Sequence, residues 1–141
     1  MAKNDKYYQC VKEALMKDGW TITHSPFTLI VSSKHKLKID LGAEREILEL
    51  ETNKEKIVVE VKSFLDKSFF NDFHTCVGQY NNYIAGLEAN KIARKLFLAI
   101  PHKVYLDHFN DPFIIDLVIR YNMSIVTFDP TINRTVLWIR R

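Results

Sequence analysis

A strand followed by one long amphipathic helix constrains the fold of this chain more than any other feature. The segment 56–62 is rich in β-branched residues and alternates in polarity, as a strand does. From about Ser68 to Ala89, apolar residues recur at the helical steps of three and four, namely Phe70, Phe73, Val77, Tyr80, Ile84 and Leu87. The continuous apolar run at 96–100 then suits a strand buried on both faces. We therefore expect the helix to lie across a sheet.

The remaining segments complete an α/β order. Asp5 can cap a helix over 6–18 that Gly19 ends, and Asp111 can cap another helix that runs through Tyr121. Short β-branched or aromatic runs predict strands at 20–23, 28–31, 37–41, 124–128 and 135–139. A turn at 52–55 joins the segment 46–52 to the strand 56–62 as a hairpin. This order predicts a three-layer α/β fold, with a mixed central sheet flanked by helices.

Length and composition are those of one ordinary globular domain over residues 1–141. Hydrophobic residues make up 47% of the 141, with only four Gly and four Pro, which excludes collagen-like and largely disordered chains. The first residues form no apolar signal core, and no run of about 18 apolar residues occurs, so we expect a cytoplasmic protein with no membrane contact. A net charge of +3 permits contact with nucleic acid without requiring it.

Several common chemical signatures are missing from the sequence. Cys10 and Cys76 lie far apart among helix-like neighbours, so we expect reduced thiols. The five histidines, at 24, 35, 74, 102 and 108, and the cysteines lack the close paired spacings of zinc sites. The glycine-rich phosphate-binding loops and the serine-hydrolase elbow are also missing.

Candidate chemistry centres on two carboxylates and a lysine. The period of two along 58–62 places Glu60 and Lys62 on one strand face. Asp40 ends the apolar run 37–41, and a turn at Gly42 would let its carboxylate converge with Glu60. Such a pair can bind Mg2+ or Mn2+ through oxygen, while the lysine offsets charge on a phosphate. A strand with one solvated face, and a turn-forming Asp40, explain the same residues without chemistry.

The arrangement of Asp40 followed by Glu60-Val61-Lys62 resembles the signature of the PD-(D/E)xK nuclease superfamily, with Ile39 in place of its proline. The resemblance implies that Asp40 and Glu60 hold Mg2+ or Mn2+ and that Lys62 is catalytic. A solvent-facing strand stays the alternative.

The run Gln79-Tyr80-Asn81-Asn82-Tyr83 is similar to the Gln-x-x-x-Tyr motif of the RecB-like branches of that superfamily. Gln79 and Tyr83 are four residues apart and share one side of a helix. The motif implies that they contact a nucleic-acid backbone or brace the catalytic lysine. Alternatively, Tyr83 is the edge of a buried stripe and Gln79 is solvated.

A closer resemblance covers almost the whole chain and is to the XisH family. It rests on six segments in order, namely 18–23, 40–44, 59–64, 78–80, 128–130 and 136–139. The family is named as a controlling factor for excision of the fdxN DNA element, and its assigned fold is restriction-endonuclease-like. A separate recombinase performs the excision, and a second family, XisI, acts in the same process. The resemblance implies a DNA-related role and leaves open whether this chain cuts DNA.

Several further residues have two explanations each. XisH relatives often have an acid or amide where this chain has Gln9, and Glu13, one turn later, can substitute for it or be plain surface. Glu44 can be a further ligand or a salt-bridge partner. Three alternating lysines, at 34, 36 and 38, can meet phosphates or protect an edge strand.

Two functions follow from these expectations. The first is a metal-dependent DNA phosphodiesterase, similar to an endonuclease, that takes part in excision or rearrangement of a DNA element. The second is a non-catalytic excision controlling factor that binds DNA or an XisI-like protein. A structural scaffold with no DNA role leaves the charged strand face unexplained. The sequence leaves cleavage specificity and a homo-oligomeric state open.

Overall fold

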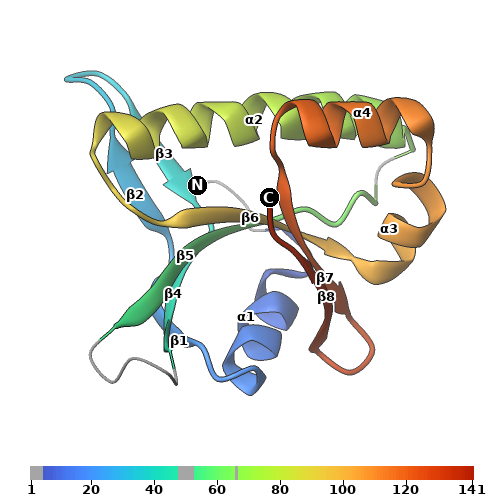
Figure 1. The fold of residues 1–141 in the computed structure, drawn as a ribbon, viewed down its shortest axis with the longest axis horizontal. Coiled ribbons are helices and arrows are strands. Elements are labelled where there is room, and N and C mark those ends of the chain that lie inside the picture. The colour runs from blue at the N-terminus through green and yellow to red at the C-terminus, as the bar shows by residue number, and fades with distance from the viewer. Residues whose placement is uncertain (1–4, 48–52, 66) are drawn as a thin grey trace.

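The computed structural model describes residues 5–47, 53–65 and 67–141 and shows a mixed α/β fold (Figure 1). Its elements in chain order are α1 (Tyr8–Lys17), β1 (Thr21–His24), β2 (Phe27–Ile30), β3 (Lys36–Ile39), β4 (Leu41–Glu46), β5 (Lys54–Val61), α2 (Phe69–Ala89), β6 (Lys95–Pro101), α3 (His102–His108), α4 (Pro112–Arg120), β7 (Ser124–Asp129) and β8 (Arg134–Ile139). The expected α/β order is confirmed.

Six strands form the central sheet in the order β1-β4-β5-β6-β7-β8, and β2 pairs with β3 in a separate ribbon. The inner strands β5, β6 and β7 are parallel, whereas the outer pairs are antiparallel. The sheet is therefore mixed. Because parallel neighbours end at the same edge, the carboxyl ends of β5, β6 and β7 lie side by side.

Helices cover both faces of the sheet (Figure 1). On one face, α2 and α4 pack over a core that includes Val58, Leu98 and Ile125. On the other face, α1 packs over a core that includes Val59 and Phe97. Alternate residues of β5 thus enter different cores, and Glu60 falls on the α2 face, as the period of two predicts.

The predicted strand 37–41 is wrong in one respect, because the chain changes sheets within it. Ile39 ends β3 in the small ribbon, and Leu41 begins β4 in the central sheet. Both side chains are fully buried, which explains why the run looked continuous. Gly42, expected in a turn, lies in β4, where an added Cβ would come within 2.8 Å of the Phe27 ring.

The hairpin before α2 also differs from the expected one. It joins β4 to β5, with Glu46 opposite Lys54, so β5 already includes part of the expected turn 52–55. The expected partner strand, 46–52, lies mostly outside the described residues. The predicted strand 56–62 is confirmed over 56–61, and Lys62 follows the end of β5.

Two helical details correct the sequence expectations. Pro101 ends β6 as expected, but the helix α3 that follows it directly was not predicted. Phe70, expected on the buried stripe of α2, is 43% exposed and stacks on Phe113. The buried face is instead formed by Phe73, Cys76, Tyr80, Tyr83, Gly86 and Leu87. Ser68 caps α2 by accepting a hydrogen bond from the Asn71 amide.

The two cysteines are free, and Cys76 is buried. Among the helices of the described chain, none has the length and apolarity needed to cross a membrane.

Candidate active site

Asp40 and Glu60 meet where the chain passes from β3 to β4 beside β5. The register of β4 on β5 pairs Leu41 with Val59, which places Asp40 next to Glu60. The Asp40 amide donates to Glu60 Oε1 at 3.2 Å, and the Val61 amide donates to Asp40 Oδ2 at 2.8 Å. The expected convergence of the two carboxyl groups is confirmed.

Glu60 is buried, with 7% of its surface exposed, so the strand face that carries it is not solvated. Burial, aided by the nearby Asp40 carboxylate, raises the pKa of Glu60 to about 8. Burial also raises the pKa of Asp40, and the Val61 amide opposes that rise. The hydrogen bond between the two carboxyl groups favours a protonated Glu60 that donates to an ionised Asp40. The pair therefore favours binding a proton, held on Glu60.

Tyr83 fixes the other oxygen of Glu60 from α2. Its hydroxyl donates to Glu60 Oε2 at 2.9 Å and lies 3.3 Å from the Lys38 carbonyl. Burial, together with the charge of Glu60, raises the pKa of Tyr83, so the phenol keeps its proton and serves as a donor. Tyr83 is thus neither a plain edge of the core nor a surface group, because it contacts the carboxyl pair directly.

Gln79 does not reach the two carboxyl groups through any hydrogen bond in the described chain. Its side chain is half-buried, and its Oε1 atom is buried without a hydrogen-bond partner among the described residues. The four-residue spacing therefore brings only Tyr83 of this motif to the carboxyl pair.

Lys62 lies just after β5, beside a small cavity of about 160 Å3. Its charge lowers the pKa of both Asp40 and Glu60, although burial outweighs this effect. The cavity is lined by Asp5, Lys62, Ser63, Phe64, Leu65, Asp72 and Thr75. The expected grouping of lysine and carboxyl groups is therefore present, and it faces α2.

Asp5 is the site residue that the sequence analysis missed. The expectation that it caps the first helix is wrong, because Tyr7 is the N-cap residue of α1 and no side chain among the described residues caps that helix. Asp5 Oδ1 instead accepts from the Tyr7 amide at 3.0 Å, ahead of the helix. Its Oδ2 accepts from the Ser63 amide at 2.8 Å, and its charge contributes to the raised pKa of Asp40. Asp5 thus brings a third carboxylate to the edge that carries Lys62. The available signal was an acid just ahead of the first helix.

Other candidate residues lie elsewhere. Gln9 is exposed on α1, and Glu13 accepts a hydrogen bond from Asn133, beside the turn between β7 and β8. Glu44 lies four residues beyond Asp40, about 13 Å away along the chain, and forms an ion pair with Lys54 at 3.1 Å. For Glu44 the structure favours the salt-bridge explanation. The lysines at 34, 36 and 38 are exposed on or beside the β2–β3 ribbon.

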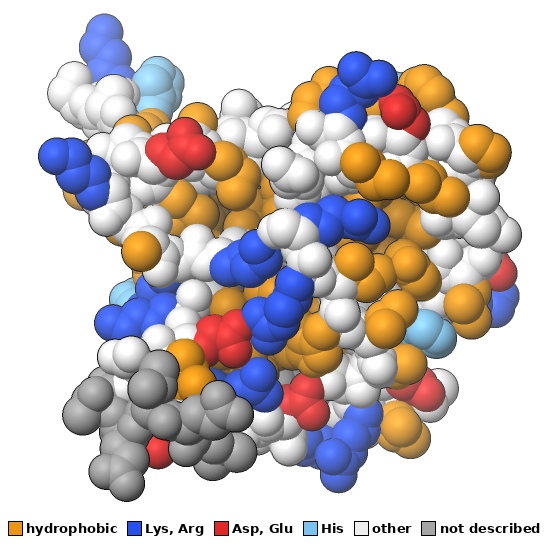
Figure 2. Space-filling view, in the orientation of Figure 1, with side chains coloured by type: hydrophobic (Ala, Val, Ile, Leu, Met, Phe, Trp, Pro, Cys, Tyr) orange, Lys and Arg blue, Asp and Glu red, His pale blue; other side chains and the backbone are white. Residues whose placement is uncertain are grey.

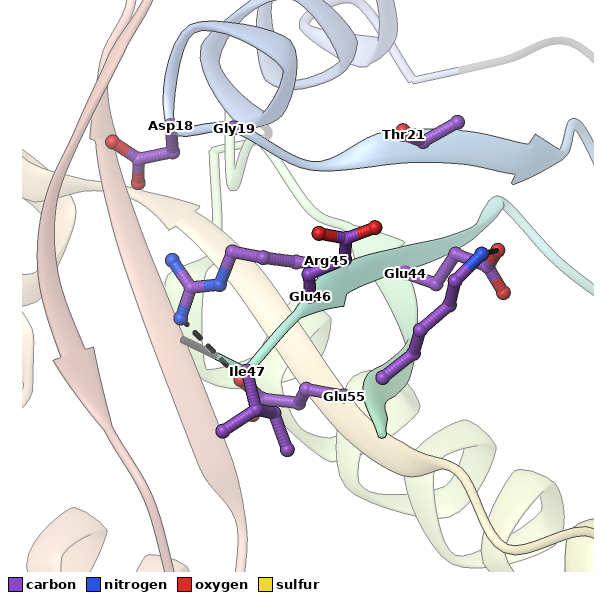
Figure 3. A pocket seen from close by; sticks show the side chains of 9 residues that line it. Asp18, Gly19, Thr21, Glu44, Arg45, Glu46, Ile47 and Glu55 are labelled. Atoms are coloured by element: carbon purple, nitrogen blue, oxygen red, sulfur yellow. Dashed lines mark hydrogen bonds and ion pairs between the residues drawn. The ribbon is translucent and has the colours of Figure 1, made fainter. Parts of the chain in front are cut away.

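A larger cavity, of about 760 Å3, lies at the opposite end of the β4–β5 hairpin (Figure 3). Two ion pairs lie in its lining, Arg45 with Glu55 at 3.3 Å and Lys54 with Glu44 at 3.1 Å. Arg140 also pairs with Glu55, and basic side chains gather around the C-terminal end of the chain in Figure 2. Glu44 and Glu55 at this cavity are partly exposed and paired with cations, which distinguishes them from Glu60, which is buried beside Asp40.

In the part of the chain that the structure describes, no three His, Cys, Asp or Glu residues cluster tightly enough to enclose a metal ion. Asp40 and Glu60 are a two-carboxylate set. Such a set suits a hard cation that also keeps water and binds substrate oxygens, as Mg2+ does. The arrangement can hold one proton or one divalent cation beside a lysine.

Comparisons with known proteins all match this chain to one family over nearly its whole length. A family model described as XisH protein matches residues 1–136. The crystal structure of an XisH family protein from Nostoc punctiforme PCC 73102 is 37% identical, with a TM-score of 0.85, over 96% of this chain and 100% of that one. The structure of an fdxN element excision controlling factor protein from Anabaena variabilis is 36% identical, with a TM-score of 0.84, over 95% and 98%. Curated proteins gave no match.

Proposed function

The chain belongs to the XisH family, and we propose that it is a metal-dependent DNA phosphodiesterase with the restriction-endonuclease-like fold of the PD-(D/E)xK superfamily. One observation carries the proposal: the carboxyl groups of Asp40 and Glu60, the latter buried, lie side by side at the strand end that carries Lys62. The name of the Anabaena variabilis relative supports a role in excision or rearrangement of a DNA element.

The donor set fits Mg2+ or Mn2+. Two carboxylates held together out of water repel each other unless a proton or a cation lies between them. Asp40 and Glu60 would hold the ion, which when bound supplies Lewis-acid polarisation of a phosphate. Such an ion would complete its ligand set with water and phosphate oxygens. The small cavity nearby is lined by Lys62 and not by the two carboxyl groups themselves.

The other side chains have separate roles in this proposal. The Lys62 ammonium group offsets the negative charge that grows on the phosphate as water attacks phosphorus and the ester oxygen leaves. Tyr83 is a positioning residue, because its hydroxyl fixes the orientation of the Glu60 carboxyl group. Asp5 holds the Ser63 amide and adds negative charge at the same edge.

Cleavage assays with single-stranded, duplex and branched DNA test this function in Mg2+ and in Mn2+, with and without an XisI-like partner. Lys62→Ala should lower the cleavage rate at least about 100-fold, because it removes a charge that acts in the transition state. Lys56→Ala is the matched control, since Lys56 is an exposed lysine on β5, the strand that ends just before Lys62. If wild-type protein shows no cleavage that Lys62→Ala removes, the proposed catalysis is wrong.

A second candidate function is a non-catalytic excision controlling factor that uses the same fold to bind DNA or an XisI-like protein. The observation that favours it is that the oxygens of the two carboxyl groups already accept hydrogen bonds. Asp40 Oδ2, Glu60 Oε1 and Glu60 Oε2 all accept hydrogen bonds from the protein itself. In that case Asp40→Asn should bind DNA or the partner as wild type does, and no cleavage should be measurable.

A further inference from the structure

The sheet edge that carries Lys62 extends across β6 to β7. Ile100 pairs with Thr127, and the Lys62 amide donates to the Ala99 carbonyl, which continues β5 opposite Ile100. The three positions thus form one row across the carboxyl ends of the parallel strands. Two strand spacings separate the ends of this row, so Lys62 and Thr127 lie about 10 Å apart.

His102 follows β6 at this edge and is held there by two side chains. Its Nδ1 lies 2.9 Å from the Thr127 hydroxyl oxygen, and Thr127 is fully buried. Its ring lies parallel to the Tyr105 ring, with a centroid distance of 6.3 Å. Because Thr127 occupies Nδ1, the half-buried ring leaves Nε2 for a ligand. Nε2 has no hydrogen bond to any residue within 5–47, 53–65 or 67–141.

Asp129 also lies near His102, but it serves the turn that leads to β8. Its Oδ1 accepts from the Thr131 amide at 2.9 Å and from the Thr131 hydroxyl at 2.6 Å. Those hydrogen bonds lower the pKa of Asp129, and the His102 charge contributes less. The Asp129 carboxylate therefore stabilises the turn before β8. The His102 imidazole is the group at this sheet edge that can donate a hydrogen bond to an anion.

Resting on the DNA function proposed above, we infer that His102 binds a DNA backbone phosphate next to the one that lies at Lys62. A strand of DNA that passes along this edge presents phosphates in series, and side-chain donors that contact them fix its register. Lys62 and His102 would contact successive parts of one backbone. Thr127 is the positioning residue that turns Nε2 of His102 outward.

The test is fluorescence anisotropy of labelled duplex DNA in EDTA, where neither metal nor cleavage is needed. His102→Asn and Thr127→Val should each weaken binding about 3–10-fold, the value of one hydrogen bond, and the double variant should be no weaker than either one. Thr127→Ser keeps the hydroxyl and should bind as wild type. His35→Asn, an exposed histidine beside the β2–β3 ribbon, is the matched control and should also bind normally.

The outcomes separate this inference from the proposed catalysis. Wild-type affinity in His102→Asn would overturn the inference, while the effect of Lys62→Ala on cleavage would still decide catalysis. The expected binding pattern without cleavage would support the phosphate contact and overturn catalysis. If the wild-type protein bound no DNA in EDTA, the inference would be wrong, and the cleavage assay with metal would still decide catalysis.

Discussion

The two ends of the β4–β5 hairpin carry acids in opposite environments. At one end, Asp40 and Glu60 are buried against each other, and both carboxyl groups have raised pKa values. At the other end, Glu44 and Glu55 form ion pairs with lysine and arginine, partly exposed to water. The same pair of strands thus builds one acid pair that favours a proton or a metal ion, and one group of acids that is already neutralised. Packing therefore gives the acids of one pair of strands two different electrostatic environments.

The largest expected effect concerns stability against pH. In the folded protein the pKa of Glu60 is about 8, against 4.5 when it is unperturbed, so the folded state binds more protons between these values. The contribution of Glu60 to the free energy of unfolding should therefore be highest below pH 4.5. It should fall by about 3–5 kcal/mol as the pH rises to 8. Glu60→Gln removes this loss.

Urea unfolding of wild type and Glu60→Gln at pH 5, 6.5 and 8.5 measures that difference. Taking the difference between the two proteins removes the contribution to pH dependence of groups that titrate in both. His24, whose pKa is lowered by burial, is one such group. Glu55→Gln, which changes the solvated acids, should keep the wild-type pH profile. Parallel profiles for wild type and Glu60→Gln would contradict a protonated Glu60.

A smaller effect is expected from Tyr83→Phe. The variant loses the hydrogen bond to a buried carboxyl group and leaves the core otherwise filled, so it should destabilise the protein by about 1–2 kcal/mol. The loss should grow as pH rises above 8, where Glu60 ionises and needs the donor more. Tyr80→Phe is a useful comparison, because the Tyr80 hydroxyl hydrogen-bonds to backbone groups of β6 and β7. The destabilisation caused by Tyr80→Phe should not change with Glu60 ionisation.

The smallest effect is expected at the solvated end of the hairpin. Glu55→Gln weakens ion pairs with Arg45 and Arg140, which lie at partly exposed positions. Such pairs contribute between 0 and about 1 kcal/mol and are screened by salt. Thermal melts in low and high salt should show a minor difference that shrinks with salt. A loss as large as that of Tyr83→Phe would remove the contrast between the two ends.

The alternation along β5 was enough to predict that Glu60 and Lys62 share a face and that Val59 lies on the other. It was not enough to predict that the face is buried. A strand with one solvated side shows the same pattern, and only the packing of α2, which brings Tyr83 onto Glu60, separates the two cases. That contact joins positions 23 residues apart.

Two other parts of the site depend on contacts that local sequence does not carry. Asp5 reaches Ser63 across 58 residues, and its local pattern fits a helix cap equally well. His102 lies in α3, which the sequence analysis missed because Pro101 was interpreted only as the end of a strand. The change of sheet at Asp40 was hidden by buried apolar residues on both sides of it.

The most direct test of the carboxyl pair as a metal site is calorimetric titration of Mn2+ into the protein at pH 7, in two buffers with different ionisation enthalpies. At this pH the pair holds a proton that the ion must displace, so binding should release about one proton per ion. Asp40→Asn should abolish this binding, and Glu55→Gln should leave it intact. Absence of Mn2+ binding by the wild-type protein, or equal binding by Asp40→Asn, would contradict the account.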